Sequence, residues 1–343
     1  MSERIDAVQF SGFTGLKNTV TPERLSEQDL AVATNIDLDD AGQPRRRRGF
    51  TLVSAGDYHS LYTIGATTYA AKDGVLGEVL SDYTFSPLQT GIGSARVAYT
   101  TVGDSTYFST NAVGGVITAG TVRDWGKTDV VGTWLSPVVN TTDTLPEVAG
   151  TSLKDPPRAS SLANLNGRIY MAVGSVLWAT ELYLYDLVDA NQNYIMFESD
   201  IAFVEAVTDG LYVGTEDGVY FLSGGLRKMS RRKVFNTGAV SGSSVMVDPH
   251  RIGGDAKGDA VRSKQAVMFL TGTGLCVGLD SGVCFNLTQG AFNFPSAQSA
   301  AVMFREQDGI SQYVGTMNSS GTPTGNTRFG DHVDVEVRRF TGS

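Results

Sequence analysis

The chain has 343 residues, of which 40 are glycine and 18% are charged, a composition that favours many short strands over a helical bundle. A length of this order fits one large repeat-built β domain preceded by an N-terminal arm. The formal net charge of −9 argues against a protein whose whole surface grips nucleic acid, because such a surface has to be basic.

The first segment, residues 1–50, is expected to be an extended N-terminal arm. A short helix could form over 21–32, with Thr21 as its N-cap and Pro22 in its first turn. The acidic stretch 37–42 resembles a calcium loop only superficially, because Ala41 and Arg48 occupy positions that need ligands, and it is better interpreted as a turn. A disordered arm would have little reason to keep its phenylalanines and leucine. We therefore expect the arm to lie against the β domain that follows it or against a neighbouring protomer.

The arm ends in the densest charge of the chain, four consecutive arginines. On an extended strand they would point to both faces, so they cannot form one solvated stripe. Two interpretations stay open: a strand end with solvated arginines, or bidentate contacts to carboxylates of a neighbouring subunit or to DNA phosphate. The acidity of the rest of the chain favours the subunit over DNA. The candidate subunit-interface residues are Phe13, Arg45, Arg46, Arg47, Arg48 and Phe50.

Six hairpins of one kind follow the arm, each with a Gly-containing turn, an apolar strand and a second apolar strand. Asn-Gly and Asp-Gly turns between apolar runs are strong hairpin signals, because glycine supplies the positive φ of type I′ turns. Several intervals between the hairpins are close to the roughly 40 residues of a four-stranded blade. The prediction is an all-β fold, a β-propeller of about six blades over residues 51–343. The central hairpin positions are Tyr69, Tyr107, Tyr170, Tyr212, Cys276 and Tyr313.

Two longer intervals are expected to hold insertions, at about 123–159 and 226–264. The second insertion begins with a basic group that is interpreted either as a solvated loop or as a contact to a subunit or to DNA in the lumen. Between its parts, residues 238–247 predict a strand that starts a new blade. Residues 331–338 alternate apolar with polar, and we expect them to close the ring by pairing with 51–53. The basic group consists of Arg227, Lys228, Arg231, Arg232 and Lys233.

Cys276 and Cys284 flank a turn and could face each other across a hairpin. Free, buried thiols are the favoured interpretation, because cysteine is a good small core residue and the chain, whose first residues contain no apolar run, is expected to stay in a reducing cytosol.

No pattern in the chain carries catalysis. The three histidines, His59, His250 and His332, have no metal-ligand spacing around them, and no nucleophile elbow, P-loop or dinucleotide fingerprint is present. Glu205, Asp209, Glu216 and Asp217 could be argued as glycosidase carboxylates, but turn chemistry already explains the two aspartates. We expect no enzyme, no cofactor and no metal.

The arm carries a resemblance to a known family. Ala33-Thr34-Asn35, the acidic turn ending at Gly42 and Arg47-Arg48-Gly49-Phe50 follow Phe10, Gly15-Leu16 and Pro22. This order resembles the tail nozzle proteins of short-tailed bacteriophages, also called tail hub or DNA-stabilisation proteins. Weaker similarities continue through the chain, at 156–159, 165–170, 238–240, 312–313 and 331–338.

The resemblance implies a structural virion protein, assembled in the host bacterial cytoplasm and located in the virion tail. It would form a ring of about six copies below the portal and adaptor, continue the DNA channel, help retain packaged DNA and dock fibres or a plug. Contact with genomic DNA would be transient and non-specific, and no membrane insertion is implied. Two alternatives stay open: a carbohydrate-binding or depolymerising propeller of a tail fibre, and a cellular propeller scaffold.

Overall fold

The computed structural model describes residues 12–34, 36–38, 41–46, 49, 51–126, 153–253, 256–292, 294, 297–307, 310–318 and 332–338, the residues 307, 310 and 332–338 by their backbone only. The chain forms two compact units. One comprises Met1–Thr51, Val240–Leu279 and Val283–Ser343, and the other comprises Leu52–Ala239 and Asp280–Gly282. Each is described by itself.

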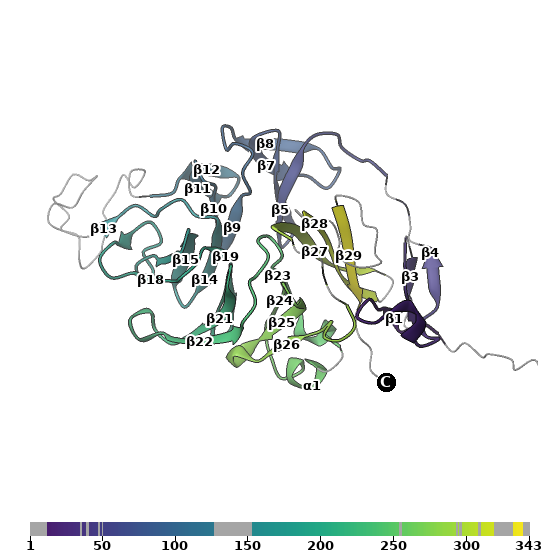
Figure 1. The fold of residues 1–343 in the computed structure, drawn as a ribbon. Coiled ribbons are helices and arrows are strands. Elements are labelled where there is room, and N and C mark those ends of the chain that lie inside the picture. The colour runs from purple at the N-terminus through teal and green to yellow at the C-terminus, as the bar shows by residue number, and fades with distance from the viewer. Residues whose placement is uncertain are drawn as a thin grey trace, which may run out of the picture. The chain divides into compact units, whose positions relative to one another are not determined.

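The unit formed mainly by Leu52–Ala239 contains four antiparallel sheets of four strands each among its described residues. Each sheet is a blade built from strands that follow one another along the chain (Figure 1). Blade 1 contains β5 (Tyr58–Ile64), β6 (Thr67–Lys72), β7 (Val75–Val79) and β8 (Phe85–Gln89). Blade 2 contains β9 (Ala98–Val102), β10 (Ser105–Ser109), β11 (Gly114–Thr118) and β12 (Thr121–Asp124). Blade 3 contains β14 (Ser161–Leu165), β15 (Arg168–Val173), β16 (Val176–Ala179) and β18 (Tyr194–Met196). Blade 4 contains β19 (Ile201–Val207), β20 (Gly210–Thr215), β21 (Gly218–Ser223) and β22 (Ser230–Phe235).

Two shorter features complete this unit. A two-stranded sheet pairs β13 (Leu153–Lys154) with β17 (Val188–Asp189). A single 3₁₀ turn, Leu226–Lys228, connects β21 to β22.

The other unit contains two further blade sheets. Blade 5 contains β23 (Val245–Val247), β24 (Ala266–Thr271), β25 (Gly274–Leu279) and β26 (Cys284–Asn286). Blade 6 has three described strands, β27 (Ser299–Gln307), β28 (Ile310–Asn318) and β29 (His332–Arg338). The connection from β23 to β24 holds a 3₁₀ turn, Pro249–Arg251, and the short helix α1 (Lys257–Ala260). The all-β propeller class predicted from the sequence is confirmed.

The central strands of the blades are apolar on both faces because each face belongs to a different core. In β15, Ile169 and Met171 pack into a cluster with side chains of blade 2. Their neighbours Tyr170 and Ala172 point the opposite way and pack into a cluster with side chains of blade 4. Successive side chains of a strand alternate between faces, so one strand serves two interfaces. The inner strand β14 accordingly contacts both β9 and β19 (Figure 1).

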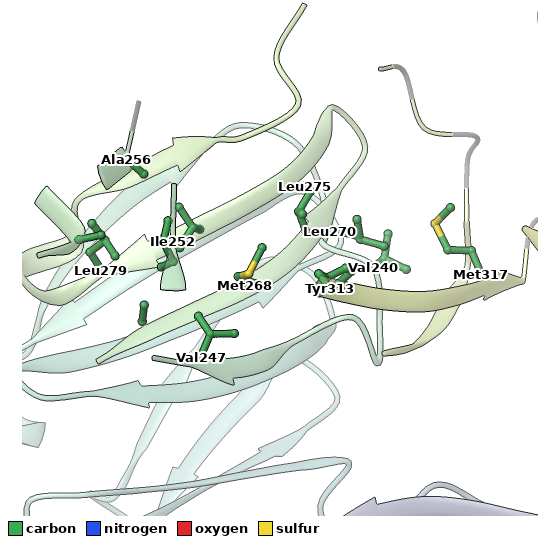
Figure 2. Close-up of a cluster of buried hydrophobic side chains, with 13 residues drawn as sticks. Val240, Val247, Ile252, Ala256, Met268, Leu270, Leu275, Leu279, Tyr313 and Met317 are labelled. Atoms are coloured by element: carbon green, nitrogen blue, oxygen red, sulfur yellow. The ribbon is translucent and has the colours of Figure 1, made fainter. Parts of the chain in front are cut away.

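The same arrangement joins blades 5 and 6. Met268 and Leu270 of β24 and Leu275 of β25 share a cluster with Tyr313 and Met317 of β28 (Figure 2). The Tyr313 hydroxyl donates a hydrogen bond to the Ser243 carbonyl at 2.7 Å, which satisfies its only polar atom in this apolar setting. All six central hairpin positions are buried: Tyr69, Tyr107, Tyr170, Tyr212, Cys276 and Tyr313.

The described part of the arm contains two small sheets. In the first, β1 (Gly15–Leu16) pairs in parallel with β2 (Asp29–Leu30). The expected helix over 21–32 is wrong: only Pro22–Arg24 forms a 3₁₀ turn, with Thr21 at the N-cap but without a side-chain cap bond. Strand pairing at residue 29 prevents the helix from continuing. In the second sheet, β3 (Ile36–Leu38) pairs with β4 (Pro44–Arg46). Of the turn expected over 37–42, Asp37 and Leu38 lie in β3, Ala41 is in a turn, and residues 39–40 lie outside the described residues.

Three further expectations from the sequence are corrected by the strands. The region 226–264 is not one inserted loop, because β22 is the fourth strand of blade 4 and β23 is the first strand of blade 5. The new blade therefore starts at residue 245 rather than at 238. The C-terminal strand β29 pairs with β28, and residues 51–53 belong to no strand, so the expected pairing between them is wrong. The first insertion, 123–159, lies mostly outside the described residues.

The two cysteines are free, and only Cys276 is buried. Cys276 lies opposite Asn286 in the sheet, while Cys284 lies opposite Gly278, so the register keeps them from facing each other. Burial raises the pKa of the Cys276 thiol to about 12. The thiolate is the reactive form, and a raised pKa removes it at neutral pH.

We therefore expect a thiol reagent such as Ellman's reagent at about pH 8 to label one cysteine of the native protein, Cys284, and both cysteines after unfolding in denaturant. A Cys284→Ser variant is the matched control and should react only after unfolding. Labelling of native Cys284→Ser at the rate of the wild type would contradict the burial of Cys276.

Candidate interaction surfaces

Two hydrogen bonds from the arm, donated by Asn18 and Thr19, join it to the rest of its unit. The Asn18 backbone N–H donates to the Ala291 carbonyl at 3.2 Å, and the Thr19 hydroxyl donates to the Gly290 carbonyl at 2.8 Å. Residues 290 and 291 follow β26, so the arm lies against the blade 5 region, as its apolar residues indicated.

The arm also folds back on itself. The Phe13 N–H donates to the Gly42 carbonyl at 2.8 Å, which joins the start of the described arm to the turn between β3 and β4. Gly42 has a φ of +73°, and a Cβ there would lie 2.5 Å from the Phe13 carbonyl oxygen. Only glycine meets both conditions without strain. Asp29 adds to the packing by accepting from the Thr14 hydroxyl at 2.7 Å, which lowers the pKa of that carboxyl.

This arrangement presents two of the predicted arginines on an exposed strand. Arg45 and Arg46 lie in β4, all of whose residues are exposed, and Arg45 is paired across the sheet with Asp37. Phe13 is half-buried. The other predicted residues of this surface, Arg47, Arg48 and Phe50, lie outside the described residues.

The second predicted basic group is a structured edge rather than a loop. Arg231, Arg232 and Lys233 lie in β22, the outermost strand of blade 4, and Arg227 and Lys228 lie in the 3₁₀ turn before it. All five side chains are exposed. We call these five residues the basic edge.

The side chains of β22 alternate between the two faces of the sheet. Arg231 lies over the rings of Phe197 and Tyr220, with its guanidinium carbon 4.6 and 4.4 Å from their centroids. Lys233 points to the same face, with Nζ 5.5 Å from the Tyr220 centroid. Arg232 points to the opposite face and lies 6.0 Å from the centroid of Phe221. Cations are attracted to aromatic faces by about 0.5–1 kcal/mol at exposed sites.

Backbone carbonyls fix both arginines further. Arg231 Nη1 donates to the Met196 carbonyl at 3.1 Å, and Arg232 Nη2 donates to the carbonyls of Ser281 and Gly282 at 2.9 and 2.8 Å. None of the five cations has a carboxylate within ion-pair distance among the described residues. Arg231 and Arg232 are therefore held in place without an ion pair to a described carboxylate.

Of the four carboxylates that a glycosidase interpretation would use, the two aspartates accept hydrogen bonds from neighbouring groups. Asp209, between β19 and β20, accepts from the Ser281 N–H at 2.9 Å and from its hydroxyl at 3.0 Å. Asp217, between β20 and β21, accepts from Ser199 and Thr215, and these bonds, together with the nearby Lys233 ammonium, lower the pKa of its carboxyl. The contact between Thr215 and Asp217 is the turn role that the sequence predicted, whereas the contacts between Ser281 and Asp209 join residues that are 72 positions apart.

A long-range ion pair joins blade 2 to blade 3, and sequence reasoning did not predict it. Arg123 of β12 forms a bidentate pair with Asp186, at 2.9 and 3.0 Å, and the neighbouring Trp125 Nε1 donates to the Tyr185 carbonyl at 2.8 Å. The partners are about 60 residues apart in sequence, so no local pattern connects them. Together they fasten blade 2 to the 181–187 loop of blade 3.

Within the described part of the chain, no group of three or more His, Cys, Asp or Glu residues could hold a metal ion. No helix there is long and apolar enough to cross a membrane.

Comparison with known proteins yields similarity of structure only. No protein-family model matches the chain, and no curated protein matches it. The chain is similar to the extracellular domain of the two-component system BT4673 from B. thetaiotaomicron, with 12% identity, 79% of this chain and 33% of that chain covered, and a TM-score of 0.46. It is also similar to virginiamycin B lyase from Staphylococcus aureus, with 13% identity, 84% and 85% coverage and a TM-score of 0.44. The N-terminal domain of Nup159 is similar at 9% identity, with 75% and 72% coverage and a TM-score of 0.41. The chain thus spans about a third of the length of the BT4673 domain.

Proposed function

We infer that this protein is a structural component of the tail of a short-tailed bacteriophage, a nozzle or hub protein that assembles into a ring below the portal and adaptor. The observation that carries this inference is the arm. Its sequence resembles the nozzle family, and its described part is an ordered segment that presents Arg45 and Arg46 on an exposed strand. An ordered, cationic segment on an acidic chain of net charge −9 suits contact with the carboxylates of a second copy.

In this proposal the ring contains about six copies and continues the DNA channel. An acidic wall lets DNA slide past because it repels the phosphates. Retention of packaged DNA and docking of fibres or a plug complete the role, and the chain catalyses no reaction. Negative-stain electron microscopy of the purified protein tests the proposal directly. Rings support it, and a protein that stays monomeric at every concentration contradicts it.

A variant without the arm tests whether the arm is needed for ring assembly but not for folding. We expect a variant that lacks residues 1–48 to remain folded and monomeric but to form no rings, because the four arginines and the exposed β4 are lost with the arm. Mass photometry and circular dichroism measure the two properties on the same sample. A matched control, Arg45→Lys with Arg46→Lys, keeps the charge and loses only bidentate geometry, so it should assemble more weakly but not fail. Ring formation by the truncated protein would contradict the role assigned to the arm.

A further inference from the structure

Two cations of the basic edge are held in fixed positions, which a strand that only faces solvent does not require. Two of its three arginines, Arg231 and Arg232, are held on aromatic rings and by three backbone carbonyls. Such fixed guanidinium groups lose little side-chain entropy when a partner binds. Because no described carboxylate pairs with them, they are available to an external anion.

The strand that carries these cations has one open side. In the sheet order β19-β20-β21-β22, the hydrogen bonds of β22 to β21 use one side, and the other side faces no further strand among the described residues. An open strand edge is a template for an additional strand. Regular pairing with β21 runs from Ser230 to Lys233 and is then interrupted by a register shift. The regular edge therefore extends over about 13 Å, enough for a short peptide segment.

The distribution of charge selects the kind of partner. Cations lie on both faces of the edge, Arg231 and Lys233 on one face and Arg232 on the other. A duplex or a flat acidic surface would meet only one of these faces. An added strand meets both, because its own consecutive side chains alternate between the faces. A run of consecutive carboxylates in an extended segment is the chemistry that matches all three cations.

We propose that β22 binds an extended, acidic segment of a partner protein, which adds to blade 4 as a fifth strand. The segment supplies backbone hydrogen bonds to the open edge and consecutive Asp or Glu side chains to Arg231, Arg232 and Lys233. Arg227 and Lys228 precede β22 in the chain and extend the cationic surface, so that a longer acidic segment can bind. The same cations repel basic strands, so the edge is selective. This proposal concerns blade 4 alone and stands whether or not the chain forms a ring.

The test is a binding titration of the full chain with a fluorescent heptapeptide, Val-Thr-Glu-Glu-Glu-Thr-Val. Two control ligands accompany it: the same peptide with alternate backbone nitrogens methylated, and a duplex DNA of equal charge. We expect the unmodified peptide to bind best, more weakly at high salt, and the methylated peptide to lose about tenfold in affinity, since it cannot complete the strand hydrogen bonds.

Variants locate the site. Removing charge from one face, in Arg231→Gln with Lys233→Gln, should weaken peptide binding about tenfold, and Arg232→Gln should weaken it severalfold. The side chains of Arg227 and Lys228 form no ion pair with a described carboxylate, so Arg227→Gln with Lys228→Gln should weaken binding without affecting folding. The matched control, Arg24→Gln with Arg262→Gln, removes two exposed cations elsewhere and should bind as the wild type does. The proposal is overturned by absence of peptide binding, by equal binding of the methylated peptide, by tighter binding of duplex DNA, or by equal loss in the control variant.

Discussion

Replacing Tyr212 by alanine is expected to lower the free energy of unfolding by about 3–5 kcal/mol. Tyr212 has no solvent-exposed surface, and its ring lies 5.0 Å from that of Phe221 on the adjacent strand β21. Truncation removes the contacts of a whole aromatic ring and leaves a cavity that the strands of blade 4 cannot close. Urea denaturation followed by fluorescence measures the loss.

Tyr83 provides the matched control, because it is the same residue type with 57% of its surface exposed. Tyr83→Ala should change stability by no more than about 0.5 kcal/mol. If both variants lost the same stability, the burial of Tyr212 in the centre of its hairpin would be contradicted.

A second large effect is expected where the chain passes from blade 4 toward blade 5. A Cβ added at Gly238 would lie 2.0 Å from the carbonyl oxygen of Glu216. The neighbouring Ala239 N–H donates to the Thr215 carbonyl at 2.9 Å, which holds this segment against the β20–β21 turn. Backbone atoms cannot rotate out of the way as a side chain can. We therefore expect Gly238→Ala to cost at least about 2 kcal/mol of unfolding free energy.

The control for this substitution is Gly225→Ala. Gly225 has a φ of −74°, and a Cβ there would meet no atom within 4 Å. The same chemical change should be neutral or stabilise by up to about 1 kcal/mol, since alanine restricts the unfolded chain. Thermal unfolding of the two variants side by side distinguishes a steric effect from a general effect of losing glycine. Equal melting temperatures would contradict the close approach at Gly238.

The hairpins could be predicted because their signals are local. Asp73-Gly74 and Asn166-Gly167 both adopt positive φ at two successive positions, 49° and 78° in the first pair and 49° and 75° in the second. These are the angles that type I′ turns require and that these residue types tolerate.

The parts that could not be predicted depend on distant partners. β22 was interpreted as a loop because its exposed cations hide the alternation by which a strand is recognised. The rings beneath the cations lie elsewhere in the chain, Tyr220 and Phe221 in β21 and Phe197 directly after β18. The 21–32 segment has helical features, but Asp29 pairs with Gly15 and accepts from Thr14, and these tertiary contacts outweigh local preference. Likewise, the hydrogen bonds from Ser281 to Asp209 join residues that are 72 positions apart, and no short sequence pattern predicts them.

The two-sided central strands have a consequence for how the protein can be divided. A blade such as blade 3 has no interior of its own: Ile169 and Met171 complete a core with one neighbour, and Tyr170 and Ala172 complete a core with the other. The stability of such a blade therefore depends on its interfaces with the blades on both sides. An excised blade would expose two apolar faces at once, and a cut between blades 3 and 4 would expose one on each fragment. A soluble fragment of this unit therefore has to keep the interfaces between blades, and a complete four-stranded sheet alone is not enough.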